Sequence, residues 1–164
     1  MTTLSAYAAV KISQQATPGE GVADYELSAN LVPFYFPQGV GSGQVSVVYV
    51  GHRVAPGAAR DDLLLTNSLQ DVFGNKLTFG VVKGVYLLAD ATNTVDIVIG
   101  NATTDPFLGW FAAAGNLEHV VPGGASMHVH PGAGWTVTAA VHDQLGITTG
   151  DGATPAGYEI IIWG

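Results

Sequence analysis

Two histidines stand two residues apart in segment 127–130, Met-His-Val-His, and this is the spacing in the chain that best suits a metal ion. On a β-strand, residues i and i+2 point to the same face, so His128 and His130 could present both imidazoles to one ion. His119 and His142 lie on neighbouring predicted strands. His128 and His130 therefore form the candidate metal site. The alternative is that they line the polar face of an ordinary strand.

The sequence around this pair resembles the metal-binding strand of cupins, because a Pro-Gly follows the second histidine. The resemblance implies a small metal-dependent enzyme. The cupin pattern also has a Glu a few residues further on, whereas segment 131–135 here reads Pro-Gly-Ala-Gly-Trp. The chain has no Gly-x-Ser-x-Gly nucleophile turn, and no acidic run has EF-hand spacing. We therefore expect no enzymatic activity and no cofactor, and the cupin-like enzyme is the least favoured alternative.

Aromatic side chains gather in two short segments that suit a contact surface. Prolines bracket the first segment, and proline in sheets is confined to edges and strand ends. The second segment is residues 107–111. The alternative is that these side chains belong to the core. The candidate contact residues are Phe34, Tyr35, Phe36, Phe107 and Trp110.

Composition limits the possible partners. Only 11% of the 164 residues are charged, against about 25% in an average domain. A surface so poor in charge favours burial in an assembly, and we expect a homo-oligomer. The net charge of −8 with five Lys and Arg argues against nucleic acid. No apolar run approaches the ~20 residues of a membrane span, and the first residues do not read as a signal peptide.

The elements that must position these residues are short strands separated by Gly and Pro turns. The pattern predicts an all-β fold, a jelly roll or β-sandwich in a single domain. Segment 63–100 reads as three strands of an antiparallel meander, and segment 135–141 alternates cleanly as one strand. Glycine-rich segment 39–43 reads as a flexible connection. We expect residues 1–20 to be an N-terminal arm or edge strand, and residues 21–164 to be the β-sandwich domain.

A series of turn and strand motifs runs from Gly41 to the C-terminus, and it resembles a family of tailed-phage and prophage virion structural proteins. The matching motifs are Gly41-Ser-Gly43, Leu69-Gln-Asp71-Val-Phe73-Gly74-Asn-Lys-Leu77-Thr78-Phe79-Gly-Val-Val82-Lys83, Asn93-Thr94, Ile97-Val-Ile-Gly100, Pro122-Gly-Gly124, Pro131-Gly-Ala-Gly134-Trp135-Thr-Val137-Thr138, Asp143-Gln-Leu145 and Tyr158-Glu-Ile-Ile-Ile-Trp-Gly164.

The resemblance implies a non-enzymatic capsid decoration (cement) protein that stabilises a phage head. Its partner would be the major capsid protein, and it would sit as a trimer on local threefold axes. The location would be the capsid surface of the virion, after synthesis in the host cytoplasm. The alternative is a tail or head-fibre component that binds a host receptor or glycan, with the aromatic segments as its contact surface.

Overall fold

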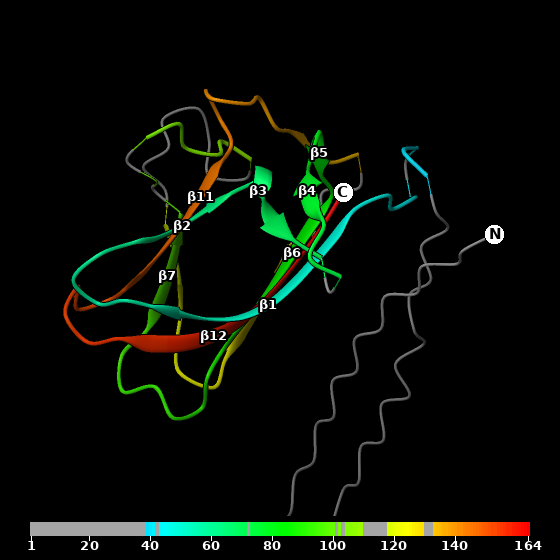
Figure 1. Cartoon of the computed structure of the whole chain (residues 1–164). Coiled ribbons are helices and arrows are strands. Elements are labelled where there is room, and N and C mark those ends of the chain that lie inside the picture. Colours follow the sequence, from blue (N-terminus) through cyan, green and yellow to red (C-terminus); the bar gives the residue numbers. More distant parts are fainter. Residues whose placement is uncertain are drawn as a thin grey trace, which may run out of the picture. The chain divides into compact units, whose positions relative to one another are not determined.

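The fold is built from strands, and the described residues contain no helix. We used a computed structural model of the chain, shown in Figure 1. The structure describes residues 39–41, 43–71, 73–100, 102, 104–109, 118–129 and 133–164. The all-β class predicted from the turn-rich sequence is confirmed.

The first four-stranded sheet is antiparallel and has the order β1-β12-β6-β9. Its strands are β1 (Val48–Ala55), β12 (Ala156–Trp163), β6 (Gly84–Ala89) and β9 (Ser126–Val129). The long strands β1 and β12, cyan and red in Figure 1, run side by side over their whole length. Strand β12 joins the two halves of the sheet because it pairs with β1 on one side and β6 on the other.

The second four-stranded sheet is also antiparallel, with the order β2-β11-β7-β8. Its strands are β2 (Asp61–Leu64), β11 (Gln144–Thr149), β7 (Ile97–Gly100) and β8 (Glu118–Val121). All four residues of β7 are buried, whereas the edge strand β8 exposes three of its four.

Two small two-stranded sheets complete the described fold. Strand β3 (Thr66–Gln70) pairs with β4 (Lys76–Thr78), and β5 (Val81–Val82) pairs with β10 (Trp135–Thr136). The turn between β3 and β4 is held by the carboxylate of Asp71, which accepts hydrogen bonds from backbone amides at 2.8 Å on either side of Gly74.

One hydrophobic core lies between the inner faces of the two larger sheets. Along β12 the buried residues alternate with more exposed ones, so that Tyr158, Ile160 and Ile162 face inward. The second sheet supplies further fully buried aliphatic side chains to the same core, namely Leu63, Ile97, Ile99, Leu145 and Ile147. Two sheets that share a core are expected of a sandwich, and the finer assignment to a jelly roll stays a prediction.

The meander predicted for segment 63–100 is only partly formed, because β3 and β4 pair as an antiparallel hairpin but the later strands do not continue it. Strands β6 and β7 follow one another in sequence but belong to different sheets. The turn between them is tied to β12 instead. Asn93 donates its side-chain amide to the carbonyl of Gly157 at 2.8 Å and accepts from the Gly157 amide at 2.9 Å. The chain is therefore anchored beside β12 before it crosses to the second sheet.

The long strand predicted over segment 135–141 is also shorter in the structure, because only its first two residues pair as β10. Ala140 adopts a left-handed backbone conformation with φ of 56°. A tight turn forms there, in which the His142 amide donates to the Thr138 carbonyl at 2.8 Å. The backbone therefore leaves the extended conformation that the alternating side chains indicated.

The β-domain that the structure describes is the unit Gly39–Gly164. The division predicted between residues 20 and 21 lies outside the described residues and stays a prediction. The predicted arm at residues 1–20 lies outside the described residues. Within the described part of the chain, no helix is long and apolar enough to cross a membrane.

Candidate functional site

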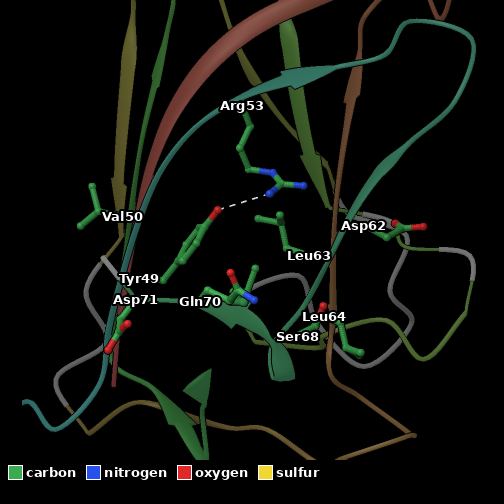
Figure 2. Close-up of a pocket in the computed structure, with 10 residues that line it drawn as sticks. Tyr49, Val50, Arg53, Asp62, Leu63, Leu64, Ser68, Gln70 and Asp71 are labelled. Atoms are coloured by element: carbon green, nitrogen blue, oxygen red, sulfur yellow. Dashed lines mark hydrogen bonds between the residues drawn. The ribbon is translucent and has the colours of Figure 1, made fainter. Parts of the chain in front are cut away.

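A groove of about 400 Å³ opens beside strand β1, between that edge of the first sheet and strands β2 and β3. Figure 2 shows Tyr49 and Arg53 pointing into the groove, whereas Val50 on the same strand points away from it. This is the pleat of a strand, on which neighbouring side chains take opposite faces. The other lining residues are Asp62, Leu63, Leu64, Ser68, Leu69, Gln70 and Asp71.

A cluster of four polar residues, two of which line the groove, joins the two sheets. Arg53 on β1 donates from Nε to Asp61 Oδ2 at 2.7 Å and from Nη2 to Asp61 Oδ1 at 2.6 Å. Tyr158 on β12 donates its hydroxyl to Asp61 Oδ2 at 2.6 Å. Arg53 Nη1 also donates to the Tyr49 hydroxyl at 3.3 Å, the dashed line in Figure 2. Asp61 belongs to β2 of the second sheet, whereas its partners belong to the first, so the hydrogen bonds hold the two sheets together. We call these four residues the Arg53–Asp61 clamp.

The protonation states of the clamp are fixed by its hydrogen bonds. Burial by itself would raise the pKa of Asp61, but hydrogen bonds from Arg53 and Tyr158 outweigh it and hold that pKa below its ordinary value. The bond to Asp61 raises the pKa of Arg53 against the effect of burial. Burial, followed by the bond to Asp61, raises the pKa of Tyr158. At neutral pH the clamp is therefore a bidentate ion pair with a neutral phenol bound to it.

The clamp residues bond mostly to one another, so they leave few hydrogen-bonding groups for a ligand in the groove. Both carboxylate oxygens of Asp61 are occupied, and the guanidinium fork is committed to them. The residues that line the groove include no histidine. The remaining polar groups of the groove, such as Ser68 and Gln70, suit hydrogen bonding to a peptide or another polar ligand.

The predicted metal site is only partly within the described residues. His128 is exposed on β9, opposite Tyr86 of β6, and its ring centroid lies 5.5 Å from that of Trp163. His130 lies outside the described residues. His119 is on β8 of the other sheet, and His142 Nδ1 donates a hydrogen bond to a backbone carbonyl at 3.2 Å. Among the described residues, no three His, Asp or Glu side chains are grouped to hold a metal ion.

The predicted aromatic contact surface is reduced by one residue. Phe107 is 2% exposed and belongs to the core, because its segment runs beside β11, where the Phe107 amide donates to the Gln144 carbonyl. The other four candidates, Phe34, Tyr35, Phe36 and Trp110, lie outside the described residues. The structure instead exposes Phe73, at 84%, on the turn between β3 and β4. Sequence analysis did not single it out, although its place in a turn closed by Asp71 was a usable signal.

Lys83 is a second residue that sequence analysis missed. It is 4% exposed, and its Nζ donates to the carbonyls of Val40, Gly41 and Gln44 at 3.2, 3.0 and 2.7 Å. Three acceptors match the three donors of an ammonium group. The described part of the glycine-rich segment 39–43 is therefore tied to the domain at the point where the described chain begins, whereas the sequence indicated a flexible connection.

Comparison with known proteins adds no relative, since no family model, curated protein or solved structure matches this chain. The site is therefore interpreted from its own residues.

Proposed function

We propose that this chain is a non-enzymatic virion structural protein that decorates and stabilises a phage head. The observation that supports the proposal best is the outer face of the first sheet. On β1 this face exposes Val50 at 58% and Val54 at 55%. Solvent-exposed valines close together on one strand suit adhesion to another protein.

The exposed valines belong to a wider apolar surface. Strand register places Ile161 of β12, Tyr86 of β6 and His128 of β9 in one row with Val50 across the sheet. Ile161 and Tyr86 are half-buried. The row therefore mixes aliphatic and aromatic surface with no full charge except on a protonated histidine, and it suits attachment by apolar contact.

The proposed partner is the major capsid protein, with the chain present as a trimer on the capsid surface. Stable interfaces bury about 1,600 Å² in total. A chain with 18 charged residues, 5 basic and 13 acidic, has few groups with which to make that contact by ion pairing. Apolar surface and backbone pairing at sheet edges should supply most of the adhesion. The resemblance to tailed-phage structural proteins from Gly41 onward points to the same partner.

A tail or fibre component that binds a host receptor or glycan is the second candidate. Two observations favour it: the exposed Phe73 at a turn tip and the polar groove beside β1. An aromatic ring near hydrogen-bonding groups suits recognition of a partly apolar ligand. This candidate differs from the first in where the protein sits and in how many copies are present.

The test is the position and copy number of the protein in purified phage or prophage particles, by quantitative mass spectrometry and labelled electron microscopy. Many copies distributed over the head are the expected result. A few copies confined to the tail would replace the decoration role with the receptor-binding one. Absence from particles would overturn both, and would make the metal-dependent enzyme at His128 and His130 the hypothesis to test.

A further inference from the structure

The edge of β1 that faces away from β12 has no strand beside it among the described residues. Just before β1, Val47 and Gly164 exchange both backbone hydrogen bonds, at 3.1 and 2.9 Å. Along an antiparallel pair of strands, hydrogen-bonded and non-hydrogen-bonded residue pairs alternate from that point. Every second residue of β1 from Tyr49 therefore bonds to β12. The amides and carbonyls of the residues between them, Val48, Val50, His52 and Val54, point to the free edge.

This free edge lacks the features that usually block strand addition. Strand β1 is eight residues long and contains no proline and no lysine. Its one permanent charge, Arg53, points into the groove and is engaged by Asp61. Long edges without such protection are the sites where an extended segment adds to a sheet. The groove at this edge leaves space beside the strand for the side chains of an added segment (Figure 2).

We propose that this edge accepts residues 4–12 of a second copy of the chain as an added strand. The inference rests on the proposed assembly and names the surface through which neighbouring copies are joined. The sequence of the segment has the period of a strand. Its apolar positions are Leu4, Ala6, Ala8, Val10 and Ile12, and between them stand Ser5, Tyr7, Ala9 and Lys11.

The length of the intervening chain permits this exchange. Residues 13–38 separate the segment from Gly39, where the described domain begins. At about 3.3 Å per extended residue, they can span roughly 80 Å, more than the width of a small domain. Lys83 holds the domain end of this connection in place through the carbonyls of Val40, Gly41 and Gln44. The segment can therefore leave its own copy from a fixed point and reach a neighbour.

The charge and the side-chain pattern of residues 4–12 also suit this edge of β1. Residues 1–18 contain Lys11 and no carboxylate, in a chain whose net charge is −8. The groove is lined by Asp62 and Asp71. Because the two faces of an added strand differ, the row with Lys11 can face these carboxylates while the apolar row lies beside Val50 and Val54. The added strand would then enlarge the apolar outer face proposed to bind the capsid.

Disulfide trapping between two singly substituted proteins tests this arrangement. The chain has no cysteine, so every disulfide reports an introduced pair. Val50→Cys protein is mixed with Ala8→Cys protein under mild oxidation, and covalent heterodimers are measured on non-reducing gels. Ala6→Cys and Val10→Cys proteins are tested against Val50→Cys in the same way, in case the added strand pairs two residues earlier or later. We expect at least several-fold more heterodimer for the best of these pairs than for the controls.

Two controls match the test closely. Val120 on the edge strand β8 has the same exposed fraction as Val50, 58%, so Val120→Cys reports random collision at an equally accessible edge. Ala9→Cys lies between the apolar positions and places the thiol on the opposite face of the added strand. Both should give little heterodimer. Circular dichroism of each variant confirms that the β-domain is folded.

Equal yields for Val50 and Val120 would overturn the inference. So would a disulfide that forms only within one chain of a Val50→Cys/Ala8→Cys double variant, since the segment would then lie on its own copy. The measurement uses free protein without particles. A failed cross-link with intact binding to heads therefore removes this inference and leaves the proposed function. A specific cross-link without binding to heads supports the inference and removes the proposed function.

Discussion

The two edges of the first sheet, β1 and β9, are built differently on the same outer face. Toward β9 the indole of Trp163 is 8% exposed and lies against Gly84 and His128, although His128 itself stays exposed. At the β1 side the face is bare, with Val50 58% exposed. Under that bare strand, on the inner side, lies the Arg53–Asp61 clamp.

The polar and histidine residues, whose types suggested chemistry, therefore lie apart from the exposed apolar surface that could bind a partner. The histidine strand β9 carries a side chain packed beside an indole, whereas the polar groups near β1 tie one sheet to the other. The exposed apolar area lies on the outer side of a strand that the clamp ties to the second sheet. A strand that is already hydrogen-bonded in place loses less conformational entropy on association than a free segment.

Gly84→Ala should have the largest effect, by disturbing the packing of Trp163 beside β9. A Cβ on Gly84 would lie 2.0 Å from Cζ2 of Trp163, which leaves no space without moving the indole. Overpacking of this kind costs about 3 kcal/mol of unfolding free energy. Gly80→Ala is the control, because nothing lies within 4 Å of its Cβ. Urea denaturation followed by tryptophan fluorescence measures both, and equal stability of the two variants would contradict close packing of Trp163.

Asp61→Ala should have the next largest effect, by removing the clamp under β1. Arg53 and the Tyr158 hydroxyl would lose their acceptor. Removing one partner of a fully buried pair costs roughly 3–5 kcal/mol. We expect about 2 kcal/mol, since the Arg53 side chain is 36% exposed and water screens part of the loss. Asp62→Ala, whose partner Arg60 is 3.9 Å away, should change unfolding free energy little in the same denaturation assay.

The clamp also predicts how stability depends on pH. Because the pKa of Asp61 is lowered in the folded state, its contribution is fully present above the ordinary value of 3.8 and is lost as pH falls through the lower, folded pKa. As the pH falls below 4, the unfolding free energy of Asp61→Asn should therefore decrease less than that of the wild type. Denaturation midpoints measured over this pH range test this. If the two proteins lose stability in parallel below pH 4, Asp61 is not ionised within the clamp.

His128→Ala should have the smallest effect. The residue is exposed on the short edge strand β9, and such a change usually shifts unfolding free energy by within about 0.5 kcal/mol. It should also leave the metal content of the purified protein unchanged, as measured by elemental analysis. A stoichiometric transition metal that disappears in this variant would instead establish the predicted site with His130.

The sequence predicted strands better than it predicted which strands meet. Short segments between Gly and Pro turns were enough to predict an all-β fold, whereas clean alternation over segment 135–141 did not keep that segment in one strand. The partner of a strand depends on contacts far along the chain. Asn93 binds Gly157, and this long-range tie, which no local spacing encodes, sends β6 and β7 to different sheets.

The candidate site was less predictable for a related reason. The acceptors of Lys83 are backbone carbonyls, which leave no signature in side-chain types. Arg53 and Asp61 are only eight residues apart, but their pairing depends on the turn that carries the chain from β1 to β2. A metal site is defined by residue types and can therefore be predicted from sequence, as for the histidine pair. An adhesive edge is defined by exposure, which the sequence does not give.

The most direct test of the proposed role is the binding of purified protein to phage heads that lack it, with isolated tails as the comparison. We expect saturable binding to heads at many copies per particle, with little loss when salt is raised, because salt screens mainly exposed charges and the chain has few. A variant that lacks residues 2–18 should stay folded and bind heads much more weakly. No saturable binding to heads, or release of the wild type by modest salt, would contradict attachment through apolar surface and strand pairing.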